Sequence, residues 1–192
     1  MPYEIQVLGT EGVRVKSATY IALIRGINVA NTQISMERLR KLCAACGFED
    51  VQTYIQSGNV VFSSGENAAS CSKALAARLQ RELGKPIAVL VRSARDLARI
   101  VTKNPFLKGK GVETARVHVA FLAEKPKADR LKALEAVDWG HDRFHYSGKD
   151  LYLHCPDGFG RSKLATTFER MLGVGATVRN WNTVSKLLEM AT

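Results

Sequence analysis

Residues 51–63 read VQTYIQSGNVVFS, and this stretch decides the fold. Two runs rich in β-branched and aromatic residues flank Ser57-Gly58, a pair typical of a two-residue turn, so the stretch predicts a β-hairpin. A similar pattern, DRFHYSGKDLYLH, occupies residues 142–154 with a turn at Ser147-Gly148. Each half of the chain is therefore expected to contain one hairpin.

The same order of elements is predicted around both hairpins. In the first half we expect strands at 20–24 and 86–91, and helices starting at Ser35, Asn67 and Ser93. In the second half we expect strands at 116–122, 142–146, 150–154 and 176–180, and helices at 127–137, 161–172 and 182–190. The repetition predicts an α+β fold of two tandem ferredoxin-like βαββαβ units, each with an added C-terminal helix, which amounts to an internal duplication.

A glycine- and lysine-rich segment separates the two predicted units. We place the first unit at 20–107, a link containing KGKGVET at 108–115, and the second unit at 116–192. Residues 1–19 fall outside the repeat and are expected to form an N-terminal leader or an extra hairpin.

The composition predicts a cytoplasmic globular protein. The chain has 192 residues, of which 46% are hydrophobic, and this is enough to bury a substantial core. It contains no apolar run of about 18 residues, and Glu4, Glu11 and Gly12 interrupt the region where a secretory signal would need an apolar core. We therefore expect no membrane partner.

Positive charge is concentrated in one segment. The net charge is +10, and the segment from Lys73 to Lys110 holds ten Lys or Arg against Glu82 and Asp96, a difference of eight. Such a segment attracts polyanions, although a solvated face that keeps the protein soluble has the same composition. Helical spacing predicts one exposed stripe of cations, made of Arg92, Arg95, Arg99 and Lys103. Under the polyanion hypothesis, this stripe binds nucleic-acid backbones.

The cysteines and histidines do not predict a metal site. Cys43 and Cys46 belong to a stripe with Leu39 and Leu42 at helical spacing, so we expect both thiols to face the core. The four histidines lie in or beside predicted strands, without the spacing of two ligands on one helix. We predict no metal and no cofactor, and catalytic residues remain unknown.

Two polar stretches, RGIN at 25–28 and QSGN at 56–59, follow strands that a crossover makes parallel, so we expect them to be neighbours. Turn chemistry explains their glycines and asparagines. It does not require the other polar side chains, and ligand binding is the alternative. The ligand-binding candidates here are Arg25, Asn28, Gln56, Ser57 and Asn59.

Two further stretches, GRSK at 160–163 and RNWNT at 179–183, are expected at one end of the second unit. GRSK enters a helix, where free N–H groups and cations favour an anion, although helix capping alone also favours Gly and Ser. The pattern is not a nucleotide P-loop. The candidates are Gly160, Arg161, Ser162 and Lys163, with Arg179, Asn180 and Asn182 from the neighbouring strand end.

Several motifs together resemble a known family. The stretches YIALIRGINV, GFEDVQTYIQSGNVVFSS, NPF, LYLHCPDGFGRSKL and ATVRNWNTVSKLLEM, spread over about residues 18–190, resemble the bacterial family known as domain of unknown function 1697. The resemblance implies an α+β protein with two ferredoxin-like halves. It implies no mechanism, because that family is itself functionally uncharacterised.

Three functional hypotheses follow. The first is binding of an anionic ligand, either a nucleic-acid backbone or a phosphorylated small molecule, at the polar element ends. The second is an enzyme acting on a phosphate- or carboxylate-bearing molecule in a cleft between the halves, although the sequence shows no nucleophile or base that would define a reaction. The third is a protein-interaction module, which would expose a large apolar patch.

Overall fold

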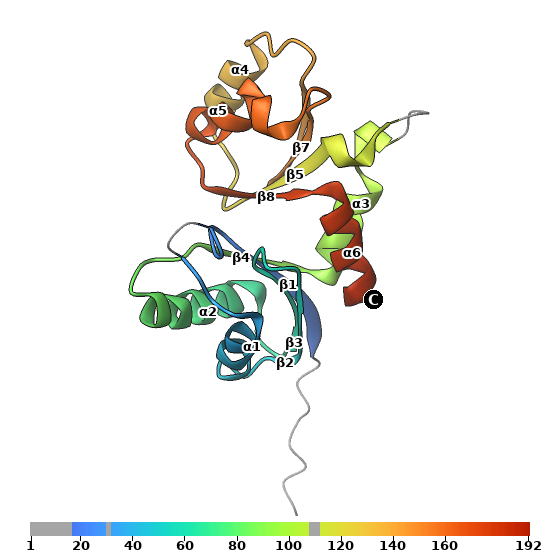
Figure 1. Ribbon diagram of the computed structural model, residues 1–192. Helices are drawn as coiled ribbons and strands as arrows, with labels where there is room; N and C mark the ends of the chain where they lie inside the picture. Colours follow the sequence, from blue (N-terminus) through green and yellow to red (C-terminus); the bar gives the residue numbers. More distant parts are fainter. Residues whose placement is uncertain (1–16, 30–31, 108–111) are drawn as a thin grey trace, which may run out of the picture.

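The computed structural model describes residues 17–29, 32–107 and 112–192 (Figure 1). The leader or hairpin predicted for residues 1–19 lies outside the described residues up to position 16, and so does the part of the predicted link at 108–111. No helix in the described part of the chain is both long and apolar enough to span a membrane.

The first half forms one four-stranded antiparallel sheet in the order β2-β3-β1-β4. Its elements are β1 (Ala18–Ile24), α1 (Met36–Ala44), β2 (Glu49–Tyr54), β3 (Asn59–Ser64), α2 (Ala68–Leu83), β4 (Val89–Ser93) and α3 (Ala94–Thr102). β4 ends two residues later than expected and includes Arg92 and Ser93.

The second half repeats this arrangement in the order β6-β7-β5-β8. Its elements are β5 (Val117–Leu122), α4 (Ala128–Glu135), β6 (Arg143–Ser147), β7 (Asp150–His154), α5 (Lys163–Leu172), β8 (Ala176–Asn180) and α6 (Trp181–Ala191). Short 3-10 helices occupy Pro105–Leu107, Thr114–Arg116 and Phe159–Arg161. The predicted α+β class, with the element order repeated, is confirmed.

The two hairpins differ in their turns. In the second half Ser147 pairs with Asp150, so a two-residue turn at Gly148 and Lys149 joins β6 and β7, one position later than predicted. In the first half Tyr54 pairs with Asn59, so residues 55–58 form a four-residue loop, and the prediction of a two-residue turn is wrong. This loop is tucked against β1, where the Ile24 N–H donates to the Gly58 carbonyl at 2.8 Å.

The helices begin where the sequence provides caps. A side-chain oxygen of the preceding residue accepts a first-turn N–H in five of the described helices. These N-caps are Ser35, Asn67, Ser93, Ser162 and Asn180. Glycines in the left-handed conformation, Gly84 and Gly173, end α2 and α5.

Each sheet has an outer core of its own. α1 and α2 cover the outer face of the first sheet, and α4 and α5 cover that of the second (Figure 1). Three of the four cysteines, all of them free thiols, are buried in these cores, and Cys46 is half-buried. Burial raises the pKa of the Cys43 thiol to about 12, so it stays protonated and poorly nucleophilic at neutral pH.

A third core joins the halves. The inner faces of both sheets share it with α3 and α6, which lie beside each other at the waist of the molecule (Figure 1). Its fully buried members include Ile21, Leu23, Leu97, Ile100, Val119, Phe121, Tyr152, Val184 and Leu187. Because neither sheet can bury its inner face alone, this core holds the halves as one folded unit.

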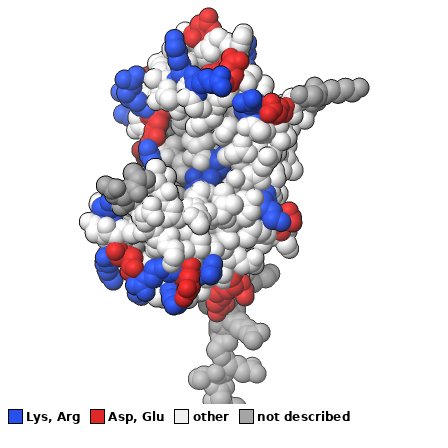
Figure 2. Space-filling model, viewed as in Figure 1, with Lys and Arg blue, Asp and Glu red and all other residues white. Residues whose placement is uncertain are grey.

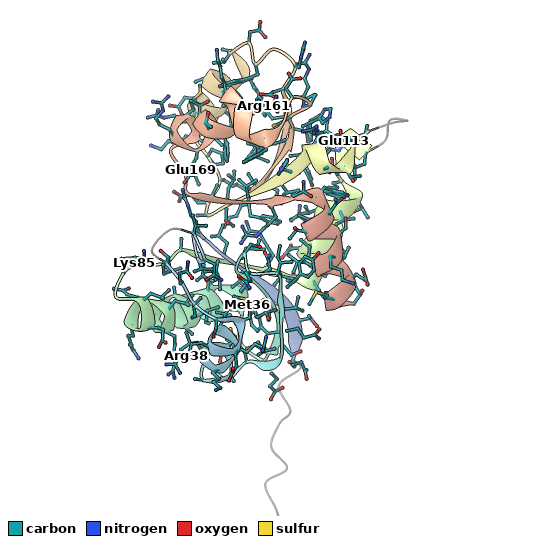
Figure 3. The ribbon with its side chains drawn as sticks, viewed as in Figure 1. Met36, Arg38, Lys85, Glu113, Arg161 and Glu169 are labelled. Carbon is teal, nitrogen blue, oxygen red and sulfur yellow. The ribbon has the colours of Figure 1, made fainter. Side chains whose placement is uncertain are left out.

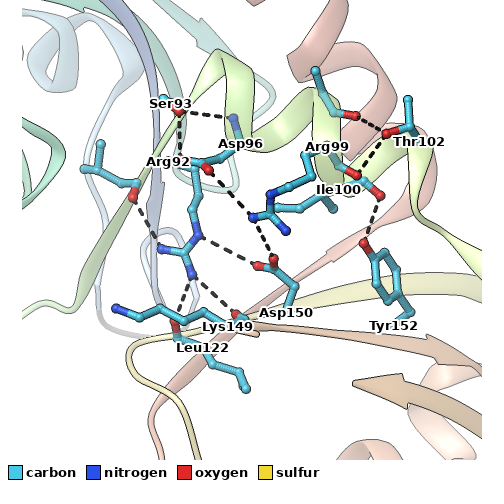
Figure 4. A network of polar contacts seen from close by, with 12 residues as sticks. Arg92, Ser93, Asp96, Arg99, Ile100, Thr102, Leu122, Lys149, Asp150 and Tyr152 are labelled. Atoms are coloured by element: carbon cyan, nitrogen blue, oxygen red, sulfur yellow. Dashed lines mark hydrogen bonds and ion pairs between the residues drawn. The ribbon is translucent and has the colours of Figure 1, made fainter. Parts of the chain in front are cut away.

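A buried ionic network crosses the same junction (Figure 4). The Arg92 side chain, 12% exposed, donates to the Leu122 carbonyl at 2.8 Å and the Lys149 carbonyl at 3.4 Å. Its Nε lies 3.8 Å from the carboxylate of Asp150, which is 1% exposed, and the Arg99 guanidinium lies 3.4 Å from the other carboxylate oxygen. Burial raises the pKa of Asp150, and the two guanidinium groups oppose that rise.

Replacing Asp150 should test this network. Asp150→Ala leaves Arg92 buried without its carboxylate and should lower the free energy of unfolding by about 3–5 kcal/mol. Asp150→Asn should cost less, because an amide oxygen still accepts and because burial already favours the neutral form of this side chain. Urea unfolding followed by tryptophan fluorescence measures both losses.

The pH dependence of stability provides a second readout. Since the folded-state pKa of Asp150 is raised, the protonated form of its carboxyl group stabilises the folded protein and the ionised form opposes folding. The stabilising contribution is complete below about pH 4 and is lost as the pH rises through the raised pKa. Asp150→Asn should remove that loss, whereas Glu82→Gln, in the exposed pair with Arg38, should barely change stability. Equal losses for Asp150→Ala and Asp150→Asn would contradict a role for the side-chain oxygens.

Candidate functional site

RGIN and QSGN are neighbours, as the crossover geometry predicts. The Asn28 side chain donates to the Gln56 carbonyl at 2.9 Å and accepts the Ile34 N–H at 2.9 Å. Asn28 itself has a positive φ of 57°, which asparagine tolerates better than most residues. Its amide is therefore used to fix the loop that leaves β1.

Arg25 forms a contact between the halves. Its guanidinium makes a two-pronged ion pair with Glu169 on α5, in which Nη2 and Oε2 are 3.0 Å apart. Figure 3 shows Glu169 at the edge of the second half that faces the first. Because both side chains are partly exposed, this pair contributes orientation more than stability.

Arg179 lies in the junction, away from GRSK. Its Nε donates to Asn59 Oδ1 at 2.5 Å, and Nη2 donates to the carbonyls of Ile24 at 2.9 Å and Ser57 at 3.0 Å. Nη1 donates to the Thr177 hydroxyl and the Val178 carbonyl. Burial lowers the pKa of Arg179 to about 10. All three nitrogens are thus occupied, which corrects the expectation that Arg179 supports an anion at GRSK.

Asn59 and Gly58 form the receiving surface for Arg179. Asn59 is fully buried, and its amide donates to Ser57 Oγ at 2.8 Å and to the Tyr54 carbonyl at 3.3 Å. A Cβ on Gly58 would lie 2.8 Å from the Ile24 carbonyl oxygen. Glycine at this position therefore allows the loop to approach β1 closely.

The predicted basic stripe is not one exposed surface. Arg92 lies on β4 and points into the junction, and Arg99 is shared between Asp150 and Asp96. Only Arg95 and Lys103 of the four are exposed without an ion pair in the described part of the chain. Figure 2 shows Lys and Arg mixed with Asp and Glu at both ends of the visible face. The expected stripe is corrected on these contacts.

GRSK lies at a hollow on the second half, at the start of α5. The hollow has a volume of roughly 650 Å³. Its lining residues are Val137, Asp138, Trp139, Gly140, His141, Asp142, Asp157, Arg161, Ser162 and Lys163. Gly160 belongs to the 3-10 helix that leads into α5, and Figure 3 places Arg161 on the second half, away from the junction.

Ser162 and Asp142 together close the start of α5. Ser162 Oγ accepts the Ala165 N–H at 2.9 Å and donates to Asp142 Oδ2 at 2.7 Å. Nearby, His141 Nδ1 lies 3.1 Å from Asp157 Oδ2. A carboxylate therefore already occupies part of the space in which the sequence predicts an anion.

Arg161 and Lys163 remain available in the hollow. Both side chains are exposed, and neither has a hydrogen-bond or ion-pair partner among the residues that the structure describes. Two cations beside the positive end of a helix dipole create a positive potential on this wall.

The side chain of Asn180 has a local structural role, and the backbone of Asn182 takes part in it. Asn180 Oδ1 accepts the Asn182 N–H at 2.9 Å as the N-cap of α6, and its amide donates to the Ala115 carbonyl at 2.9 Å. Neither side chain lines the hollow. These contacts favour capping over ligand binding for RNWNT.

Sequence reasoning missed the acidic wall of the hollow. Asp138, His141 and Asp142 precede β6, and Asp157 follows β7. The pairing of Arg143 with His154 brings these two segments together, so the hairpin register was the available indication. Within the described residues, no group of three or more His, Cys, Asp or Glu side chains is arranged to hold a metal ion.

Comparison with known proteins agrees with the fold. A family model described as "Protein of unknown function (DUF1697)" matches residues 18–152. The structure is similar to that of the conserved bacterial protein SP0830 from Streptococcus pneumoniae, with a TM-score of 0.73 and 22% sequence identity, covering 91% of this chain and 98% of that one. No curated protein matches. At this identity the similarity shows the fold alone.

Substitution of Gly58 should test the close approach at the junction. Gly58→Ala adds both a left-handed backbone cost of about 1–2 kcal/mol and a clash with the Ile24 carbonyl. Gly148→Ala is the matched control, since Gly148 also has a positive φ but open space around its Cβ position. Thermal unfolding should show a clearly larger loss for Gly58→Ala. Equal losses would mean that the loop yields without weakening the Arg179 contacts.

Proposed function

The chain belongs to the family of proteins of unknown function DUF1697, and we propose that it binds a small molecule carrying a phosphate or carboxylate group in the hollow at the start of α5. The observation that supports this most directly is the pair of unpartnered cations, Arg161 and Lys163, on one wall of that hollow in the described part of the chain. Charge-assisted hydrogen bonds from such groups are the usual means of holding an oxyanion.

The carboxylates that also line the hollow restrict the ligand. Asp138, Asp142 and Asp157 would repel a molecule that carries negative charge alone. A ligand that has hydroxyl or amine groups beside its anionic group suits both the cations and the carboxylates, because carboxylates accept hydrogen bonds from those donors. Phosphorylated sugars and amino-acid-like molecules belong to this class.

The other hypotheses receive less support. An enzyme between the halves would need a cleft there, but the cavity lined by Arg25 and Thr177 has a volume of about 50 Å³ and suits only a few water molecules. The nucleic-acid hypothesis loses Arg92 and Arg99 to the junction network. For a protein-interaction module, the exposed large apolar side chains are Val29, Ile55 and Val137 in the described residues. Three exposed apolar side chains fall short of the large apolar patch that this hypothesis requires.

A titration tests the proposal. Inorganic phosphate and a phosphorylated sugar, added while backbone amide shifts are followed by NMR, should move the signals of residues 160–165 most. Arg161→Ala and Lys163→Ala should each weaken binding about tenfold, the effect of one lost charge-assisted hydrogen bond. Asp142→Asn should strengthen phosphate binding, because it removes a negative charge and retains an acceptor for Ser162.

Arg170→Ala provides the control. Arg170 is an exposed arginine on the same helix, outside the hollow, so its loss changes the net charge equally without touching the proposed site. Its affinity should match that of the parent. The proposal fails if Arg161→Ala binds like the parent, or if Arg170→Ala weakens binding as much as Arg161→Ala does.

A further inference from the structure

Arg92 and Arg179 occupy equivalent positions in the two halves. Arg92 lies on β4 opposite Ile21 of β1, and Arg179 lies on β8 opposite Val119 of β5. Each arginine is followed at once by the N-cap residue of the helix that enters the shared core. The two halves therefore present the same side chain at the same point of the junction.

The acceptors of these arginines are equivalent too. Arg179 donates to the Ile24 carbonyl at 2.9 Å and lies 3.5 Å from the Gly58 carbonyl. Arg92 donates to the Leu122 and Lys149 carbonyls. In each half the two accepting residues are joined by one backbone hydrogen bond, from Ile24 to Gly58 and from Leu122 to Lys149, both 2.8 Å long. Each half thus gives and receives the same contact.

The side chains that face the Nε atoms of the two arginines extend the correspondence. Asn59 is paired with Leu23, two residues beyond the partner of Arg92 on β1. Asp150 is paired with Phe121, two residues beyond the partner of Arg179 on β5. Asn59 accepts from Arg179, and Asp150 faces Arg92.

The apolar residues of the shared core also lie at equivalent positions in the two halves. Leu97 and Ile100 lie four and seven residues after the N-cap Ser93, and Val184 and Leu187 lie four and seven residues after Asn180. On the sheets, Ile21, Leu23 and Val61 correspond by register to Val119, Phe121 and Tyr152. The apolar surface that each half buries in the junction is therefore built from the same positions.

From this reciprocity we propose that the junction is a pseudo-symmetric interface between two similar halves, and that the first half of one chain can dock on the second half of another copy to form a dimer with exchanged halves. Contacts that are equivalent in both directions define such an interface. Each half also has its own outer core. The backbone passes between the halves once, between α3 and β5, so exchange requires no threading. All the junction contacts of the monomer recur in the dimer.

Two complementary variants test the exchange. The glutamate of an Arg92→Glu variant faces Asp150 within its own chain, and the arginine of an Asp150→Arg variant faces Arg92 and Arg99, so each variant alone places like charges together at the junction. When the two are unfolded in urea and refolded together at a 1:1 ratio, exchange pairs the introduced glutamate of one chain with the introduced arginine of the other. The second junction of that dimer keeps the parent pair. Native mass spectrometry should find a mixed dimer at twice the 21.1 kDa of one chain.

A matched pair of variants controls for general charge effects. Arg38 and Glu82 also form an ion pair, but both belong to the first half, so exchange of halves cannot bring Arg38→Glu of one chain to Glu82→Arg of another. Their mixture should give no more mixed dimer than the parent chain does at the same concentration. As large a mixed-dimer fraction from this control pair as from the junction pair would overturn the proposal, because charge attraction alone would then explain dimer formation.

If the two single variants give no mixed dimer, the proposal is tested with the chain that carries both junction changes and with the parent chain. If the double variant Arg92→Glu, Asp150→Arg folds but the two single variants give no mixed dimer, the proposal is overturned. If the double variant does not fold, the parent decides. Isotopically heavy and light parent chains, refolded together at rising concentration, should then give a growing fraction of mixed-mass dimer, and its absence at every concentration overturns the proposal.

Discussion

The burial of one arginine from each half among the backbone carbonyls of the other half is the constraint on which this structure depends. A guanidinium removed from water must have its N–H groups satisfied, and carbonyl oxygens at strand ends are fixed acceptors that meet this need. Arg179 meets it with acceptors on all three nitrogens, a geometry that the compact ammonium group of lysine could not reproduce. The relative position of the halves follows, because moving either half would leave a buried cation without partners.

This constraint also determines where a ligand can bind. Arg92, Arg179, Asn59 and the loop at 55–58 fill the seam that a two-domain enzyme would use for its cleft. Accessible cations with open space beside them occur at the far end of the second half, at the start of α5. The best candidate site is therefore built by one half, from α5 and the β6–β7 hairpin, and the other half contributes stability.

Local structure can be predicted from the sequence, and contacts between the halves largely cannot. Ser93 and Asn180 identify helix starts because a cap requires only neighbouring residues. The exposed stripe predicted for Arg92 is wrong because helical spacing does not extend back into β4, and the partners Leu122 and Asp150 are distant in sequence. Charge counting could not reveal this, since a paired arginine and a free one count alike. The repeated Val-Arg before each cap, at 91–92 and 178–179, was the available indication.

We call each buried arginine together with its acceptors in the other half an arginine clamp. The two clamps differ in the side chain that faces the arginine, which is Asp150 for Arg92 and Asn59 for Arg179, and the helices beside them explain this difference. α3 brings a second cation, Arg99, to the Arg92 clamp, where it lies 3.4 Å from Asp150. At the corresponding place α6 carries Lys186, which pairs with Glu189 at 2.7 Å. Two neighbouring guanidinium groups repel each other unless a carboxylate lies between them, whereas a single guanidinium surrounded by carbonyl dipoles needs only the amide oxygen of Asn59. The acid is therefore matched to the extra arginine: Asp150 accompanies Arg99 beside Arg92, and the amide of Asn59 suffices for Arg179 alone.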